Sequence, residues 1–185
     1  MKTLFLTVII CVSNYLVCAQ VFNEIDQRVY KDSSFTKLYS ELFKYYDASG
    51  SLILKVQFID GQKHGMQMEF YPSGKLFATL NFIHGKVNGQ IIEYCEDGKI
   101  LLKGNFVFGK KSGKAFWYYP NGILETEGNF KNDMQDGDWV FYYGSGRLEC
   151  KGKYNEGKQV GLWNFNADDK ISNTRRLNYD LVTSK

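Results

Sequence analysis

The feature that most restricts the fold of this chain is a phrase that recurs every 24 residues. Three glycine positions and two aromatic positions keep this register. The glycine series are Gly50, Gly74, Gly98, Gly122 and Gly146; Gly65, Gly89, Gly113, Gly137 and Gly161; and Gly61, Gly85, Gly109 and Gly157, the last interrupted by Asp133. The aromatic series are Tyr46, Phe70, Tyr94, Tyr118 and Tyr142, and Phe58, Phe82, Phe106, Phe130 and Tyr154. Five series in one register indicate a repeat array.

Each repeat predicts a β-hairpin. In the unit that begins at Gly137, residues Leu148 to Tyr154 alternate between apolar or small residues and charged ones, which is typical of a half-buried strand. The segments PSGK, EDGK, PNGI and GSGR lie between the two strands, and a turn with positive φ favours their glycine. Gly104, Gly128 and Gly152 fall inside the second strand. There we expect an aromatic ring of the next strand to lie over the glycine.

Stacked hairpins predict an all-β fold: a repeat array of 24-residue β-hairpins that forms one long twisted antiparallel sheet. A lone hairpin is marginally stable, whereas a row of hairpins shares its core between neighbours. The repeats are expected within residues 41–170, in units that start near residues 41, 65, 89, 113, 137 and 161. Residues 20–40 would supply an N-terminal cap and first strand, and residues 171–185 a C-terminal cap or tail.

Residues 1–19 have the pattern of a secretory signal peptide, a basic start followed by an apolar run. Val17 and Ala19 fit the small-residue positions of a cleavage site, so we expect cleavage between Ala19 and Gln20. A transmembrane anchor is the weaker alternative, because Ser13 and Asn14 interrupt a run shorter than the ~20 residues that a span needs. The chain is therefore expected to be exported, to the periplasm, the outer surface or the medium.

Cleavage would leave two cysteines, Cys95 and Cys150. The repeat places them about five strands apart, which is more than ~20 Å at ~4.8 Å per strand. A disulfide needs Cα atoms within ~7 Å, so no intramolecular bridge is expected. Cys150 is interpreted as a small core residue.

The stretches FIDGQKHGMQMEFYPSGKL, Phe58 to Leu76, and GNFVFGKKSGKAFWYYPNG, Gly104 to Gly122, resemble the MORN repeat. The 24-residue length is similar to that of bacterial MORN-variant repeats in YwqK-type antitoxin proteins. This resemblance covers about residues 35–165 and departs from the pattern at Asp133 and in the last unit, at NADDKI. It implies a MORN-like fold and an antitoxin-like role that neutralises a partner toxin. It also implies, as a second alternative, binding to a membrane-lipid surface.

No motif predicts catalysis. His64 and His84 lie in inter-hairpin turns without a partner motif, and the chain contains no nucleophile elbow, phosphate loop, CxxC or HExxH. The acids of NDMQDGD depart from the spacing of a calcium loop. We therefore expect no enzyme, no catalytic or metal-ligating residue and no cofactor. A net charge of +3 argues against nucleic acid as a partner. Cleavage would remove Lys2 and leave +2 (22 basic minus 20 acidic residues), which makes a membrane lipid a weak partner.

The candidate binding residues come from two alternating positions of each first strand. The third and fifth residues after the first glycine are apolar in the four units that start at residues 65, 89, 113 and 137, as in Met68 and Phe70, which indicates a structural face. The second and fourth change from polar to aromatic along the chain. The candidate residues are Trp117, Trp139, Phe141, Trp163 and Phe165, with Tyr119 and Tyr143. They would form an exposed aromatic face that recognises a protein or a cell-envelope component.

The second interpretation of this face is a packed layer, or a surface covered by the tail from Ile171 to Lys185. The pattern leaves both interpretations open, and it leaves the oligomeric state open too. The predicted function is an exported, non-enzymatic binding or scaffold module.

Overall fold

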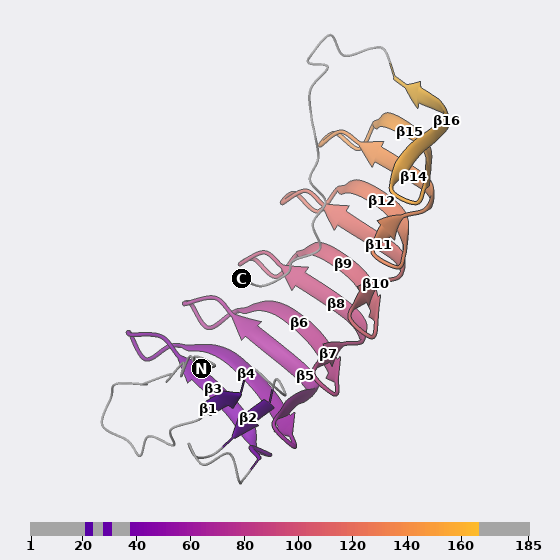
Figure 1. Ribbon diagram of the computed structural model, residues 1–185. Helices are drawn as coiled ribbons and strands as arrows, with labels where there is room; N and C mark the ends of the chain where they lie inside the picture. Colours follow the sequence, from indigo (N-terminus) through magenta and orange to yellow (C-terminus); the bar gives the residue numbers. More distant parts are fainter. Residues whose placement is uncertain (1–20, 24–27, 31–37, 167–185) are drawn as a thin grey trace, which may run out of the picture.

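The computed structural model describes residues 21–23, 28–30 and 38–166, and every regular element in these residues is a β-strand (Figure 1). The predicted signal peptide and the predicted C-terminal tail lie outside the described residues. The strands are β1 (Val21–Asn23), β2 (Arg28–Tyr30), β3 (Leu42–Tyr46), β4 (Leu52–Ile59), β5 (Gln62–Phe70), β6 (Leu76–Ile83), β7 (Lys86–Val87), β8 (Gly89–Tyr94), β9 (Ile100–Val107), β10 (Lys110–Lys111), β11 (Gly113–Tyr118), β12 (Leu124–Lys131), β13 (Met134–Gln135), β14 (Gly137–Tyr142), β15 (Leu148–Asn155) and β16 (Lys158–Phe165).

Fourteen strands form one open sheet, in the order β16-β15-β14-β12-β11-β9-β8-β6-β5-β4-β3. The short strands β7, β10 and β13 pair with β6, β9 and β12, and β1 and β2 form a separate two-stranded sheet. Each described strand pair is antiparallel; β5, for instance, pairs Gly65 with Phe82 on β6. Sequence order and spatial order coincide, so each hairpin contacts only its neighbours along the array. The predicted fold class, an all-β hairpin array in one antiparallel sheet, is confirmed.

The glycines of the hairpin turns have positive φ, as predicted; φ is 81° at Gly74 and 87° at Gly98. The turns that join one hairpin to the next hold two successive residues with positive φ, for example Phe108 at 47° and Gly109 at 86°. This is the type I′ arrangement, which favours asparagine, aspartate or glycine at its first position. A phenylalanine with this backbone conformation is strained.

Tyrosines just beyond the first strands connect neighbouring units. The Tyr71 hydroxyl donates a hydrogen bond to the carbonyl oxygen of Tyr94, 23 residues further on, at 2.7 Å. Tyr119 repeats this bond to the carbonyl of Tyr142 at 2.9 Å. Cys95 occupies the same repeat position in the unit between them, where a thiol is too short to reach the next unit. The array thus has one junction without the tyrosine bond between two that have it.

Replacing Cys95 with tyrosine is expected to stabilise the protein. The new hydroxyl would reach the Tyr118 carbonyl as Tyr71 reaches Tyr94, and a hydrogen bond of this kind contributes about 0.5–1.5 kcal/mol. Urea unfolding measures the gain. Cys95→Phe supplies the ring without the hydroxyl and serves as the control; equal stability of the two variants would contradict the proposed bond.

Both cysteines are free thiols. Cys95 directly follows β8 and Cys150 lies in β15, with β9, β11, β12 and β14 between them. Cys150 is half-buried against the main core cluster, in line with its interpretation as a core residue. Its burial, and then the neighbouring Glu149 carboxylate, raise the pKa of the Cys150 thiol to about 11. This thiol therefore stays protonated, and unreactive, at neutral pH.

The core lies on one side of the sheet, called the inner face below. Alternate residues of β4 to β14 supply it, because successive side chains of a strand point to opposite faces. Its buried members are Val56, Phe58, Gln67, Ala78, Phe82, Ile91, Leu102, Phe106, Ala115, Trp117, Thr126, Phe130, Trp139 and Phe141. The opposite, outer face carries half-buried Met68, Ile92, Phe116 and Val140.

Candidate functional site

The aromatic residues predicted as a binding surface lie on the inner face, and its central part is buried. Trp139 is 0% exposed, Trp117 8% and Phe141 6%. The prediction that these three form an exposed surface is wrong, and the alternative of a packed layer describes them. The prediction that the constant apolar positions form the structural face is also wrong, because those side chains occupy the half-exposed outer face.

Glycine on the second strands is the physical reason for this burial. A Cβ built on Gly128 would lie 2.2 Å from Cδ2 of Trp139, and one on Gly152 would lie 2.3 Å from Cδ2 of Trp163. Each indole therefore lies directly on the backbone of the preceding strand, in space that a side chain would fill. The prediction that aromatic rings cover the strand glycines is confirmed at Gly128 and Gly152. At the third predicted glycine, Gly104, the residue equivalent to Trp139 is Ala115, which has no ring.

Five of the predicted residues form one continuous aromatic row. The ring centroids of Trp117 and Trp139 are 5.8 Å apart, those of Trp139 and Phe141 6.1 Å, those of Phe141 and Trp163 6.1 Å, and those of Trp163 and Phe165 6.5 Å. Such distances are typical of interacting aromatic rings. Tyr119 and Tyr143 do not belong to this row, since both lie half-buried beyond the ends of β11 and β14.

The row opens at its C-terminal end, on the last strand. Phe165 is 71% exposed and Leu162, also on β16, is 91% exposed. Trp163 lies between them and is half-buried, and its indole Nε1 is buried without a hydrogen-bond partner among the described residues. By contrast, Nε1 of Trp139 donates to the Asn129 carbonyl at 3.2 Å. Of the predicted site, this end is the part that a partner can contact.

Sequence reasoning missed a polar cluster at the other end of the inner face. Lys63 Nζ donates to Oε1 of Gln67 at 2.8 Å, and Nε2 of Gln67 donates to Oε1 of Glu69 at 2.6 Å. Glu93 lies on β8, on the other side of β6 from Glu69, and both Glu69 and Glu93 pair with Ala78 of β6 in the sheet register. The sequence does contain a signal for this cluster. The second and fourth residues after the first glycine of a unit include Gln67, Glu69 and Glu93, where the last units have aromatic residues.

Burial shifts the pKa values of two residues in this cluster, Glu93 and Lys63. Burial, and then the nearby Glu69 carboxylate, raise the pKa of Glu93. Burial lowers the pKa of Lys63, which the Glu69 carboxylate partly offsets. Because the folded protein holds the Glu93 proton more tightly than the unfolded chain does, ionisation of Glu93 costs stability as pH rises above its unfolded pKa, about 4.3.

Replacing Glu93 with glutamine is therefore expected to raise stability at pH 7. The difference from the parent should shrink as pH falls towards 4, where the carboxyl is protonated in both states and carries no penalty. Urea unfolding across this pH range checks the result. Glu96→Gln, at an exposed position, is the control and should change stability by less than about 0.5 kcal/mol at any pH. A Glu93→Gln gain that does not vary with pH would contradict the electrostatic cause.

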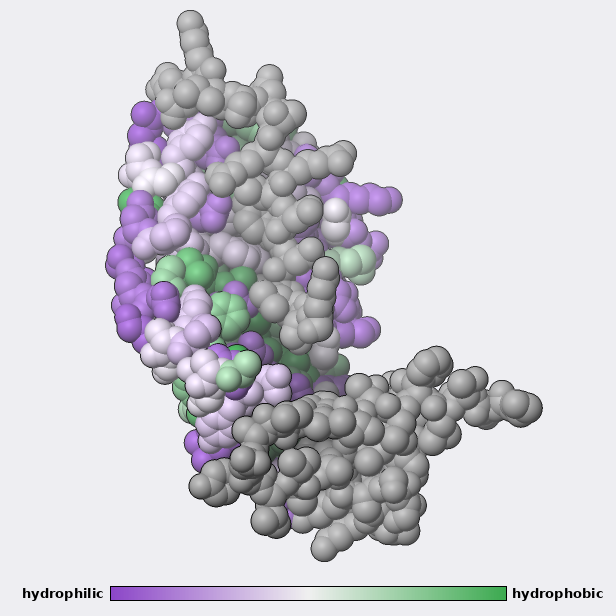
Figure 2. All heavy atoms as spheres, turned by 90° about the vertical axis from the view of Figure 1, so that its left-hand side faces the viewer, coloured by the Kyte–Doolittle hydropathy of each residue, from purple (hydrophilic) through white to green (hydrophobic). Residues whose placement is uncertain are grey.

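Figure 2 shows one side of the array, where hydrophobic side chains gather along the middle between hydrophilic margins. Within the described part of the chain, no three His, Cys, Asp or Glu side chains gather so that they could hold a metal ion. The described residues also contain no helix long and apolar enough to cross a membrane.

Comparison with known proteins gives one family and a set of distant structures. The family model described as "MORN repeat variant" matches residues 63–84 and 111–132. No curated protein matches the chain. Two similar solved structures are crystal structures of TarM. One is a mutant of S. aureus TarM in complex with fondaparinux, alpha-GlcNAc-glycerol and UDP, with 16% identity and a TM-score of 0.35 over 51% of this chain and 19% of that chain. The other has 17% identity and a TM-score of 0.34 over 51% of this chain and 20% of that chain. The chain spans about a fifth of the length of either structure.

Proposed function

We propose that this chain is an exported, non-enzymatic binding or scaffold module that holds a protein partner at the open aromatic end of its inner face. The MORN-type repeats suggest a binding or scaffold module. One observation carries the location of the contact. Phe165, which is 71% exposed, lies two residues from half-buried Trp163 on β16, so both side chains face the inner side of the sheet.

The strand that carries these residues also supports a protein as the partner. Within the described residues β16 has one neighbour, β15, at the end of the sheet. An added strand of a partner could pair with the backbone of its other edge, with apolar side chains of the partner against Phe165 on the inner face. The pattern of residues 1–19 supports export.

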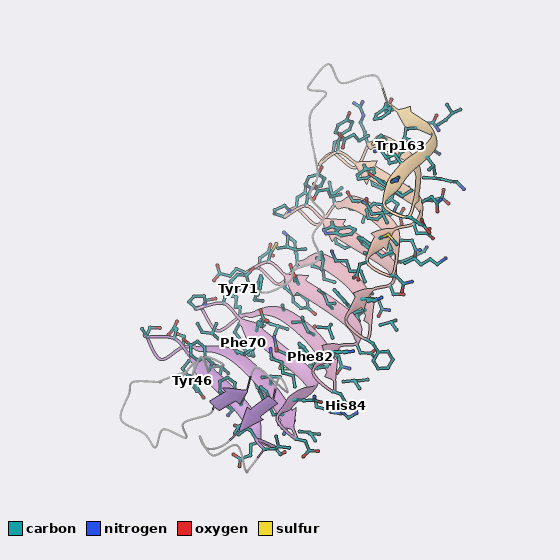
Figure 3. The ribbon with its side chains drawn as sticks, in the orientation of Figure 1. Tyr46, Phe70, Tyr71, Phe82, His84 and Trp163 are labelled. Atoms are coloured by element: carbon teal, nitrogen blue, oxygen red, sulfur yellow. The ribbon has the colours of Figure 1, made fainter. Side chains whose placement is uncertain are left out.

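A pull-down from cell-envelope and culture fractions tests this function, with the full chain tagged at its C-terminus. Phe165→Ser changes an exposed inner-face side chain, so the fold should persist, and it should lose at least tenfold of the partner that the parent recovers. Tyr46→Ser is the matched control, because Tyr46 is 47% exposed on β3 at the opposite end of the array (Figure 3).

Equal recovery by the parent and Phe165→Ser would overturn the proposed site. If the partner lost by the variant is a toxin whose expression alone kills cells, the antitoxin alternative implied by the resemblance becomes the specific function. Circular dichroism of each variant shows that a loss of binding is not a loss of fold.

A separate observation favours a second candidate function, binding to an anionic membrane surface. The inter-hairpin turns line one long margin of the sheet, here called the turn margin (residues 83–86, 107–110 and 131–134; Figure 1). It exposes Val107 by 48%, Phe108 by 60% and Met134 by 43%. Exposed Lys86, Lys110 and Lys131 flank them. Apolar side chains that enter the interface among lysines that bind anionic headgroups are typical of membrane-surface proteins.

Phe108→Asn distinguishes an effect of this residue on membrane binding from an effect on stability. Asparagine suits the left-handed backbone at position 108, where φ is 47°, so this variant should be at least as stable as the parent. In flotation with vesicles that contain an anionic lipid, it should bind severalfold less than the parent. Parent binding that shows no dependence on anionic lipid, or is unchanged by Phe108→Asn, would dismiss this candidate.

A further inference from the structure

The two histidines of the chain lie side by side, although 20 residues separate them in sequence. His64 belongs to β5, and His84 lies in the turn between β6 and β7, at the end of the strand that carries Phe82 (Figure 3). Their ring centroids are 5.6 Å apart, with an angle of 72° between the ring planes. Sequence reasoning interpreted His64 as a structural residue and found no partner motif for either histidine.

This separation fits two imidazoles that share one metal ion. Metal–nitrogen bonds of about 2.0–2.1 Å place the centroids of two imidazoles on a tetrahedral ion about 5 Å apart. The observed 5.6 Å therefore requires only a small adjustment of the two rings. His84 is exposed and His64 is half-buried, so an ion from solvent would meet the His84 imidazole first.

The hydrogen-bonding state of His64 points in the same direction. In the next unit, Asn88 Oδ1 accepts a hydrogen bond from the Phe108 backbone N–H at 3.0 Å. In the preceding unit, Ser40 Oγ accepts one from Asp60 N–H at 2.8 Å. His64 has the equivalent position, yet its Nδ1 is buried without a partner among the described residues. A buried polar atom without a partner is costly, and a bound ion is one explanation for it.

We propose that His64 and His84 together bind one divalent transition-metal ion of the kind that imidazole prefers, Cu²⁺ most tightly and Zn²⁺ less so. Two protein ligands leave coordination positions open, which water or a side chain of a binding partner would fill. The neighbouring cation does not occupy the site, because the Lys63 ammonium lies over the Phe82 ring at 5.0 Å and hydrogen-bonds to Gln67. Its charge nevertheless weakens the affinity for a dication.

Copper uptake by the full chain without an affinity tag tests the site, with Cys11→Ser/Cys18→Ser/Cys95→Ser as the common background so that these three thiols do not bind the ion. We expect one equivalent of Cu²⁺, and an electron paramagnetic resonance spectrum with coupling to imidazole nitrogen. His64→Asn and His84→Asn should each weaken uptake at least tenfold and remove this coupling.

Both substitutions are already present in this chain at equivalent positions, as Asn88 and Asn132, so both variants should fold. Lys86→Asn changes an exposed neighbour of His84 and is the matched control; it should bind Cu²⁺ at least as tightly as the background. No stoichiometric uptake by the background protein, or uptake retained in either histidine variant, would overturn the proposal.

Discussion

Replacing Gly128 with alanine is expected to lower the free energy of unfolding by about 3 kcal/mol, the upper end of the usual cost of overpacking. The added Cβ would lie 2.2 Å from Cδ2 and 2.3 Å from Cε2 of Trp139. Neither group can yield easily, because one is sheet backbone and the other is an indole with 0% exposure. Urea unfolding of the parent and the variant measures the loss.

Two controls separate the clash from a general effect of glycine. Gly144→Ala places a methyl group where nothing lies within 4 Å, so it should change stability by less than about 0.5 kcal/mol. In a Trp139→Ala background, Gly128→Ala should be close to neutral, because the ring that it meets is gone. This double-mutant cycle gives the coupling energy directly. An equal loss in both backgrounds would show that the indole is not the cause.

Trp139→Ala is expected to cost about 3–5 kcal/mol, the range of large-to-small changes of buried aromatic residues. The ring of Trp139 contacts Trp117, Phe130, Phe141 and Tyr154, with centroids between 5.3 and 6.1 Å away. The substitution removes these contacts and the hydrogen bond to Asn129. Urea unfolding gives the magnitude, with exposed Phe165→Ala as a control that should cost less than about 1 kcal/mol.

The loss should also be local. In a repeat array each unit contacts only its neighbours, so stability is close to a sum of unit and junction terms. Hydrogen exchange of Trp139→Ala should therefore rise most in β12, β14 and β15, and least in β4 and β5. A uniform rise along the sheet would contradict this nearest-neighbour description.

The fold could be predicted from the sequence because its signals are local and recur. The glycine series fix the turns, since the backbone at Gly74 and Gly98 requires positive φ. Alternation within each second strand fixes the strands. The strand glycines Gly128 and Gly152 even predict their aromatic neighbours. The period itself then fixes the order of the hairpins in space.

The buried face could not be predicted from alternation alone, because both faces of the sheet carry apolar side chains. Constancy of residues such as Met68 and Phe116 on the outer face suggested a core there, whereas the core varies from Gln67 to Trp139 along the inner face. The sequence nevertheless contains a signal that assigns the buried face, the glycine within the second strand. A ring that covers a strand glycine must lie on the same face as that glycine, so Gly128 already assigned Trp139 to the packed side.

The histidine pair was missed for a different reason. The hydrogen bonds from Asp60 to Ser40 and from Phe108 to Asn88 span 20 residues, and this offset differs from the 24-residue period. A search for the period compares equivalent residues and so overlooks side chains that meet at another offset. His64 and His84 meet at the 20-residue offset.

The missing tyrosine bond at Cys95 has a mechanical consequence. An array held at its two ends transmits force from hairpin to hairpin through the junctions between units, and the junction with the fewest bonds yields first. Tyr71 and Tyr119 reinforce the junctions on either side by bonds of 2.7 and 2.9 Å, while Cys95 cannot. Asp47, at the same position of the first hairpin, also lacks this bond, because its carboxylate accepts from Ser49 and Ser51 of its own turn. Under tension the array should therefore part at the junctions next to Asp47 and Cys95 before it parts at those of Tyr71 and Tyr119.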